Sequence, residues 1–210
     1  MTDKRLVGLY VIADTAFLSD ASLIDSAASA IEGGTSIVQY RDKRSDHRRR
    51  LEQARKLRCL CAKSGVLFIV NDDIEIAAKT GADGVHLGAG DAGIVEARRQ
   101  LGEKAVIGAS CYNSLEQVRS AIDEGADYVA LGSVYRSPTK SEATRVDLDT
   151  IIAARAEFRL PIACIGGITA ENAGPVVDAG ADMLAVMSGV FGQPDITAAA
   201  RNLARLFNSV

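Results

Sequence analysis

Short apolar runs alternate regularly with segments of helical periodicity along the chain, and this alternation leaves few folds open. The runs are rich in Val and Ile, and most are continuous rather than interrupted by polar residues. Continuous runs of this kind are typical of parallel strands that are covered on both faces. Eight such strands are predicted, at residues 6–13, 36–40, 66–70, 84–87, 105–109, 128–131, 161–165 and 183–187.

Between the predicted strands lie eight segments with helical spacing of apolar residues, at 21–32, 46–64, 74–80, 93–101, 114–124, 147–158, 172–179 and 196–208. Several of these segments end in glycine directly before the next strand, which favours a left-handed residue that closes the helix. The closing tripeptides are Gly33-Gly34-Thr35, Gly81-Ala82-Asp83, Gly125-Ala126-Asp127 and Gly180-Ala181-Asp182.

Strict strand-then-helix alternation indicates either an open doubly wound sheet or a closed barrel. No glycine-rich GxGxxG turn follows the first strand, as a dinucleotide-binding sheet would require. Eight units in 210 residues fit the compact end of the barrel range. The sequence therefore predicts an α/β protein, a (β/α)8 barrel of the TIM type, with one domain over residues 1–210.

Composition excludes several classes of partner. A net charge of −3 argues against nucleic-acid binding, and the basic cluster Arg48-Arg49-Arg50 begins a helical pattern in which arginines line a solvated face. The sequence contains no run of 18 apolar residues, so no membrane span is predicted. The start of the chain lacks the pattern of a signal peptide and the four cysteines lack CxxC spacing, so we expect a cytoplasmic protein with reduced thiols. A homo-oligomer remains open.

In barrels of this type the active site forms at the carboxyl ends of the strands. After the second predicted strand, Gln39, Arg41 and Lys43 recur with a period of two, so all three side chains point into the barrel mouth if the strand continues. Two cations and an amide facing inward favour an anionic ligand, whereas the alternative is solvated charge. The whole run 39–43, including Tyr40 and Asp42, is predicted to contribute to substrate binding.

Two aspartates follow the neighbouring third and fourth strands, Asp72 and Asp91. Carboxylates at the mouth suit Mg²⁺, which takes one or two protein carboxylates and completes its shell with water and phosphate oxygens. Aspartate also caps helices, and each residue lies just before a predicted helix, Asp72 before the one at 74–80 and Asp91 before the one at 93–101. Metal binding and helix capping both remain open.

Further polar and small residues follow the later strands. Ser110 follows the fifth strand, and the segment Ser137-Pro138-Thr139-Lys140 after the sixth brings together two hydroxyls and an ammonium, although Ser-Pro is also ordinary turn chemistry. Gly166-Gly167 with Ser188-Gly189 matches the phosphate site that barrels build from their last two loops, although paired glycines are common in turns. For His86 we favour a packed or hydrogen-bonded structural role over catalysis. Neither a Ser-His-Asp arrangement nor a zinc-ligand cluster is present.

The motifs together resemble the thiamine-phosphate synthase family in order and spacing over nearly the whole chain. They are Gly8-Leu9-Tyr10-Val11-Ile12-Ala13-Asp14, Gln39-x-Arg41-x-Lys43, Val70-Asn71-Asp72, Gly84-Val85-His86-Leu87-Gly88, Ile107-Gly108-x-Ser110, Thr139-Lys140 and Ile165-Gly166-Gly167-Ile168.

The resemblance implies an alkyl transfer in which 4-amino-5-hydroxymethyl-2-methylpyrimidine pyrophosphate reacts with a thiazole phosphate, giving thiamine phosphate and pyrophosphate. By the same resemblance Asp72 and Asp91 hold Mg²⁺, and Arg41, Lys43 and Lys140 act on the departing pyrophosphate. The pyrimidine substrate is held by Gln39, Arg41, Lys43, Asn71, Ser110 and Lys140. The thiazole phosphate is held by Ser137, Thr139, Gly167 and the backbone of Met187 and Ser188.

The chain departs from the family pattern at two places. It has Tyr135-Arg136-Ser137-Pro138-Thr139-Lys140 where Phe-Pro-Thr-x-Thr-Lys is usual, and Ala89 where Gln usually follows His-Leu-Gly. Two alternative functions remain open, a related thiazole tautomerase and a non-catalytic barrel that senses thiamine intermediates. Neither needs the charged residues predicted to surround a metal pyrophosphate.

Overall fold

Eight parallel strands close into a barrel in the computed structural model, which describes residues 6–88, 93–136 and 145–207. Each strand pairs with the next along the chain, and β8 returns to β1. The predicted barrel is confirmed, with strand ends shifted by at most a few residues. The strands are β1 (Gly8–Asp14), β2 (Ile37–Arg41), β3 (Leu67–Asn71), β4 (Gly84–Leu87), β5 (Val106–Tyr112), β6 (Tyr128–Gly132), β7 (Ile162–Ile165) and β8 (Met183–Val186).

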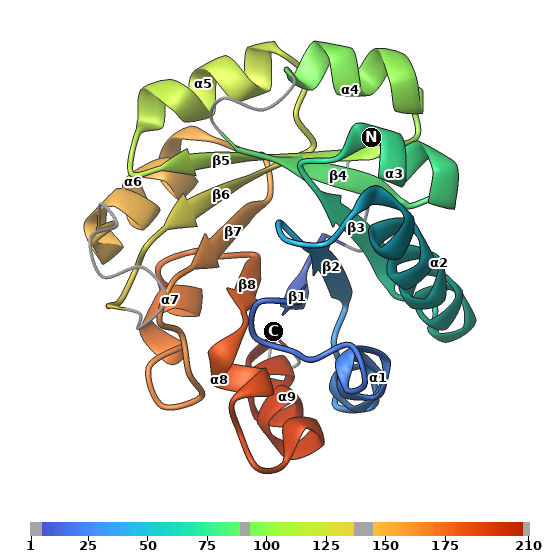
Figure 1. Cartoon of the computed structure of the whole chain (residues 1–210). Helices are drawn as coiled ribbons and strands as arrows, with labels where there is room; N and C mark the ends of the chain where they lie inside the picture. Colours follow the sequence, from blue (N-terminus) through green and yellow to red (C-terminus); the bar gives the residue numbers. More distant parts are fainter. Residues whose placement is uncertain (1–5, 89–92, 137–144, 208–210) are drawn as a thin grey trace.

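Helices surround the strands as an outer ring (Figure 1). Every predicted helix is present in the described part of the chain, and one short helix that the sequence did not predict, α8, follows β8. The helices are α1 (Leu23–Glu32), α2 (His47–Ser64), α3 (Ile74–Thr80), α4 (Ile94–Leu101), α5 (Leu115–Asp123), α6 (Leu148–Glu157), α7 (Gly174–Asp178), α8 (Ser188–Phe191) and α9 (Ile196–Ala204), with a 3₁₀ turn at Arg205–Phe207.

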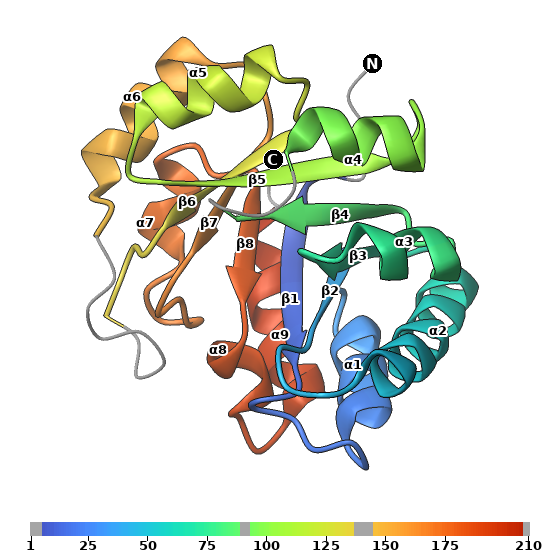
Figure 2. The ribbon, with the colours of Figure 1, turned by 45° about the horizontal axis from the view of Figure 1, so that its top comes forward.

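The barrel closes at the two ends of the chain. In the tilted view β1 lies between β8 and β2, and α9 lies beside α1 (Figure 2). Thr197 of α9 donates its hydroxyl to the carbonyl of Ser29 in α1 at 3.0 Å. No helix in the described ranges is long and apolar enough to cross a membrane.

Side chains alternate between two apolar layers. The outer layer lies between strands and helices, and it includes Leu9, Val38 and Tyr40. The inner layer fills the barrel with residues of opposite parity, including Tyr10 and Ile37. This alternation is the expected consequence of the two-residue period of a strand, and it decides which side chains reach the barrel mouth.

The repeated Gly-Ala-Asp tripeptides stabilise the amino-terminal end of the barrel. Gly81, Gly125 and Gly180 all have positive φ, as the sequence predicts. The aspartate that follows in each tripeptide accepts a backbone N–H of the preceding strand. The acceptor–donor pairs are Asp83 with Phe68 at 2.9 Å, Asp127 with Ile107 at 2.8 Å and Asp182 with Ile162 at 2.8 Å.

An arginine from the helix that precedes the accepted strand also pairs with each aspartate. The ion pairs are Arg58 with Asp83, Arg98 with Asp127 and Arg155 with Asp182, from helices α2, α4 and α6. Each aspartate therefore joins a helix to two neighbouring strands. Asp127 and Asp182 accept from both a backbone amide and a guanidinium, so their bonds to the arginines are charge-assisted hydrogen bonds.

Candidate active site

The carboxyl ends of β1 and β2 bring an ion pair into the barrel mouth. Asp14 is the last residue of β1 and Arg41 is the last residue of β2, and the two are paired in strand register. The guanidinium of Arg41 donates to the buried carboxylate of Asp14, whose other oxygen accepts the backbone N–H of Ala16 at 2.8 Å. Asp14 thus holds the Arg41 head group in one orientation at the mouth.

A second cation lies next to this pair. Lys43 follows the end of β2, and its Nζ lies 3.0 Å from Oδ2 of Asp72, which follows β3. The Lys43 side chain is 59% exposed and that of Asp72 is 25% exposed, so the lysine remains accessible to an anion from solvent. Arg41, Lys43, Asp14 and Asp72 together carry two positive and two negative formal charges.

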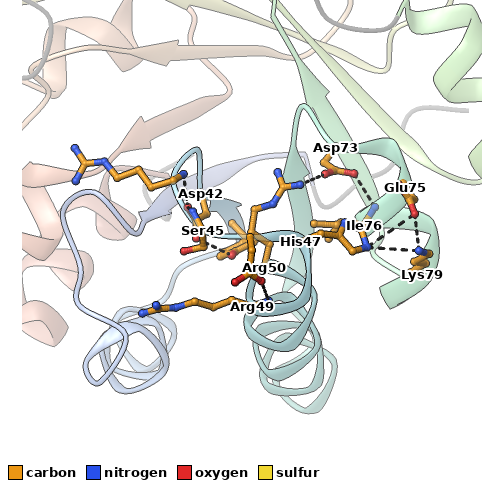
Figure 3. Close-up of polar contacts among 12 residues, drawn as sticks. Asp42, Ser45, His47, Arg49, Arg50, Asp73, Glu75, Ile76 and Lys79 are labelled. Carbon is orange, nitrogen blue, oxygen red and sulfur yellow. Dashed lines mark hydrogen bonds and ion pairs between the residues drawn. The ribbon is translucent and has the colours of Figure 1, made fainter.

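Asp73, and not Asp72, caps helix α3. The Asp73 carboxylate accepts the backbone N–H of Ile76 at 2.8 Å and pairs with Arg50 of α2 at 2.9 Å (Figure 3). Asp72 has a φ of 63°, a left-handed conformation that non-glycine residues rarely adopt. The capping alternative for Asp72 is therefore removed, and its carboxylate pairs with Lys43 at the mouth instead.

The predicted residues Gln39 and Ser110 are joined across the barrel interior. Gln39 donates to the hydroxyl of Tyr10, and Ser110 lies 2.9 Å from Nε2 of His86. Tyr128 connects the two halves, since its hydroxyl lies 2.9 Å from both the Tyr10 hydroxyl and Nδ1 of His86. The His86 ring is buried and hydrogen-bonded at both nitrogens, which agrees with the packed, hydrogen-bonded position expected for it.

Asn71, the last residue of β3, lies beside His86 in the register of β3 and β4. Its position agrees with the strand-end location predicted for it. Gln39, Arg41, Asn71 and Ser110 all have the parity of the inner layer.

Tyr40 and Asp42 are not brought to the mouth. Tyr40 belongs to the outer layer and donates its hydroxyl to Gln53 of α2 at 2.7 Å. Asp42 accepts the backbone N–H groups of Arg44 and Ser45 at 2.8 and 3.0 Å, so it stabilises the turn before α2. Both side chains serve local structure at these positions.

The ends of β7 and β8 form the other half of the mouth. Gly167 has a φ of 61°, and a Cβ there would lie 2.5 Å from the carbonyl oxygen of Arg136, so this loop requires glycine. Asn172 fixes the loop by donating to the carbonyl of Gly167 at 3.0 Å and accepting from the N–H of Thr169 at 2.8 Å. Met187 precedes α8, which begins at Ser188.

Four predicted residues, Asp91, Ser137, Thr139 and Lys140, lie outside the described residues. Within the described ranges there is no cluster of three or more His, Cys, Asp or Glu side chains that could hold a metal ion by themselves. A metal at Asp72 would therefore complete its shell with other donors, such as water and substrate oxygens.

Comparison with known proteins identifies the family to which the chain belongs. Residues 9–190 match a family model described as thiamine monophosphate synthase. The chain belongs to this family. A thiamine-phosphate synthase from Thioalkalivibrio sulfidiphilus is 48% identical over 98% of both chains, and one from Thiobacillus denitrificans is 52% identical over 88% of both.

Solved structures agree with the family assignment. A thiamine phosphate pyrophosphorylase from Pyrococcus furiosus superposes with a TM-score of 0.89 at 33% identity, covering 98% of both chains. A 3-hexulose-6-phosphate synthase superposes with a TM-score of 0.70 at 19% identity, covering 95% of this chain and 99% of the other. The second likeness shows the fold alone.

Sequence reasoning did not assign a role to several residues that the structure places around the family's predicted site. Asp14, Tyr10 and Tyr128 are inward-facing and polar, and each contacts a predicted substrate residue directly or through one neighbour. A signal was present for all three, because a polar side chain at an inward position of a buried strand is uncommon and needs a partner.

Proposed function

We propose that the chain is a thiamine-phosphate synthase. It joins 4-amino-5-hydroxymethyl-2-methylpyrimidine pyrophosphate to a thiazole phosphate, in plain or carboxylated form, and releases pyrophosphate. Family membership and the names of the two bacterial relatives support this reaction. One observation links this reaction to residues of the protein: Arg41 and Lys43 both lie at the barrel mouth, each beside a carboxylate.

In this reaction the bond between the pyrimidine methylene carbon and the pyrophosphate oxygen breaks, and the pyrophosphate leaves with the electron pair. A new bond forms between that carbon and the thiazole nitrogen, so no oxidant or reductant is needed. Arg41, Lys43 and Lys140 stabilise the negative charge that develops on the leaving group. Because Arg41 is held by Asp14, its head group does not need to reorganise during the reaction.

Charge balance at the mouth supports a divalent cation. The two cations are already matched by Asp14 and Asp72, so the four groups carry no net charge. A pyrophosphate ester with multiple negative charges needs further positive charge. Asp72 fits Mg²⁺, since it is a hard oxygen donor that does not cap α3, and Asp91 would share the ion with it. When bound, Mg²⁺ would neutralise charge on the pyrophosphate.

The thiazole phosphate would lie at the opposite side of the mouth. Gly167 and the backbone of Met187 and Ser188 follow β7 and β8, the position where barrels of this type bind phosphate. The glycine permits close approach of a phosphate oxygen to the backbone. Ser137 and Thr139 would add hydroxyl donors.

One assay tests the synthase against its two alternatives. The purified chain is incubated with both substrates and Mg²⁺, with and without a chelator, and thiamine phosphate and pyrophosphate are measured. The synthase gives both products in equal amounts only when Mg²⁺ is present. Isomerised thiazole without coupling would indicate a tautomerase, and tight binding without turnover would indicate a sensor.

We further propose that the reaction takes place in the cytoplasm. All four cysteines are free thiols, and free thiols suit a reducing compartment.

A further inference from the structure

Five polar side chains from five different strands form a continuous hydrogen-bonded chain through the barrel. The order is Gln39 of β2, Tyr10 of β1, Tyr128 of β6, His86 of β4 and Ser110 of β5, with successive distances of 2.6, 2.9, 2.9 and 2.9 Å. Only the two ends are predicted substrate contacts. The three middle residues have no role in the reaction as proposed above.

Tyr10 and Tyr128, in the middle of this hydrogen-bonded chain, are buried in the barrel interior. Tyr10 is 1% exposed and Tyr128 is not exposed at all. Burial raises the pKa of both phenols well above the ordinary value of 10.0. Both hydroxyl groups therefore keep their protons at any pH at which the protein works, and each has one proton to donate.

Packing holds Tyr128 in this position as well. Its ring stacks on His86 with centroids 5.5 Å apart and meets the edge of Tyr10 at 6.0 Å. Gly108 of β5 makes the space for it, because a Cβ at that position would lie 2.0 Å from Cζ of Tyr128. The motif glycine before Ser110 thus serves the aromatic ring rather than a turn.

The chain has a direction. Gln39 donates its amide N–H to the Tyr10 oxygen. Each phenol has one proton, and both protons find an acceptor within this chain only if Tyr10 donates to Tyr128 and Tyr128 donates to Nδ1 of His86. With Nδ1 an acceptor, the neutral ring carries its proton on Nε2, and that N–H donates to the oxygen of Ser110.

This direction determines what Ser110 offers to a ligand. Its oxygen already accepts from His86, so its hydroxyl proton points away from the interior chain and toward the barrel mouth. With the opposite His86 tautomer, Ser110 would donate inward and would present only lone pairs. The buried chain therefore sets whether Ser110 acts as a donor or as an acceptor.

We propose that Tyr10, Tyr128 and His86 are positioning residues that fix Ser110 as a hydrogen-bond donor, and Gln39 in one orientation, for an acceptor atom of the pyrimidine substrate. The proposal rests on the proposed function for the identity of that substrate. It differs from a purely structural role because it predicts one His86 tautomer and an effect on one of the two substrates.

The first test measures the tautomer and needs no activity. The chain has two histidines, His47 and His86, so a ¹⁵N spectrum of the imidazole rings is assigned with the single variant His47→Gln. We expect His86 in the neutral form with its proton on Nε2. In Tyr128→Phe the acceptor at Nδ1 loses its donor, and the His86 signals should shift toward a mixture of tautomers. A proton on Nδ1 in the unaltered protein would overturn the proposal, as would signals that Tyr128→Phe leaves unchanged.

The second test is kinetic. Tyr128→Phe should raise KM for the pyrimidine pyrophosphate by about tenfold, the scale of one buried hydrogen bond, while KM for the thiazole phosphate stays the same. Thr35→Val is the matched control: it removes a buried hydroxyl that donates to the carbonyl of Ala30 at 2.8 Å, in the turn between α1 and β2 before that strand begins. It should lower stability without changing either KM.

Two results would show that the hydrogen-bonded chain has only a structural role. One is an equal change in both KM values in Tyr128→Phe, and the other is the same KM change in Thr35→Val. If Tyr128→Phe does not fold by circular dichroism, Tyr10→Phe removes the contact of Gln39 while Tyr128 can still donate to His86. KM for the pyrimidine pyrophosphate should then rise while the proton of His86 stays on Nε2, and an unchanged KM would overturn the proposal. Failure of the unaltered protein to form thiamine phosphate would refute the proposed function alone, since the tautomer is read independently of turnover.

Discussion

Replacing Asp14 with asparagine removes a buried charge at the barrel mouth and changes almost nothing else. The side chains have nearly the same volume, and the asparagine oxygen can still accept the N–H of Ala16. What disappears is the carboxylate that receives the Arg41 guanidinium. Arg41 then lies among the ends of the strands without its counter-charge.

The cost follows from how deeply the pair is buried. Removing one partner of a fully buried ion pair costs about 3–5 kcal/mol, whereas an exposed pair contributes about 1 kcal/mol or less. Asp14 is buried, but the Arg41 side chain remains 28% exposed, so water compensates part of the loss. We expect Asp14→Asn to lower the free energy of unfolding by about 1–3 kcal/mol.

The effect on activity should appear in kcat. Loss of a negative charge makes the mouth more positive, so KM for the pyrimidine pyrophosphate should not rise. Loss of orientation at Arg41 weakens stabilisation of the leaving group, and we expect kcat to fall by about tenfold to a hundredfold, equivalent to about 1.4–2.7 kcal/mol. Urea unfolding and steady-state kinetics measure the two effects separately.

Asp127→Asn is the control for this variant. Asp127 also pairs with an arginine, Arg98, at 2.7 Å and also accepts one backbone N–H, but it lies at the amino-terminal end of the barrel. It should lose comparable stability and keep kcat within about twofold. Equal losses of kcat in both variants would refute the reasoning, and so would unchanged kcat in Asp14→Asn.

Three further predictions follow from the described contacts. Asp72→Ala should lose most Mg²⁺-dependent product formation yet melt like the unaltered protein, whereas Asp73→Ala should lose about 1 kcal/mol of stability with its helix cap; an Asp72→Ala chain that is unfolded by circular dichroism would contradict this. Gly108→Ala should destabilise the fold by about 1–3 kcal/mol in urea unfolding, because the new methyl group would overlap the Tyr128 ring; wild-type stability would show that the ring can move. Burial raises the pKa of three thiols from 9.0 to about 12, so at pH 8 a thiol reagent should modify only the exposed Cys59 quickly, and a second fast-reacting thiol would disprove the burial. The free energy of unfolding should fall as pH rises above 9, because these thiols ionise first in the unfolded chain. The buried thiols are Cys61, Cys111 and Cys164.

The sequence was sufficient to predict the fold because the relevant signals are local. Apolar runs, helical spacing and closing glycines each report on a single strand or helix. A closed parallel barrel is one of very few folds that accommodate eight strand-then-helix units in succession. The short helix α8 was missed because four residues are too few to show a helical period. It overlaps Ser188-Gly189, which had been interpreted as a phosphate turn.

The same local reasoning separates the residues of β2. A period of two places Gln39 and Arg41 inside and Tyr40 outside, and the structure has this arrangement. The same period places the Tyr40 side chain on the outer face, where it contacts α2, while Asp42 accepts backbone amides of the next turn, so a contact of either side chain with substrate stays a prediction.

Partners across strands could not be predicted in the same way. Asp14 meets Arg41 because β1 and β2 pair in the register that sets these two residues opposite each other. Nothing in a single sequence fixes that register, and a shift by one residue would have placed Asp14 beside Tyr40 or Asp42. The interior chain from Gln39 to Ser110 also includes two contacts, Tyr10–Tyr128 and Tyr128–His86, between strands that are not neighbours in the barrel.

Similar ion pairs at the two ends of the barrel therefore serve different purposes. At the amino-terminal end, Asp83, Asp127 and Asp182 each tie an arginine and a strand amide together, and these contacts stabilise the fold. At the carboxyl end, Asp14 makes the same two kinds of contact, but its arginine faces the mouth. We expect that stability can be varied at one end without changing the chemistry at the other, and Asp14 and Asp127 form an informative pair because each joins an arginine and one backbone amide, at opposite ends of the barrel.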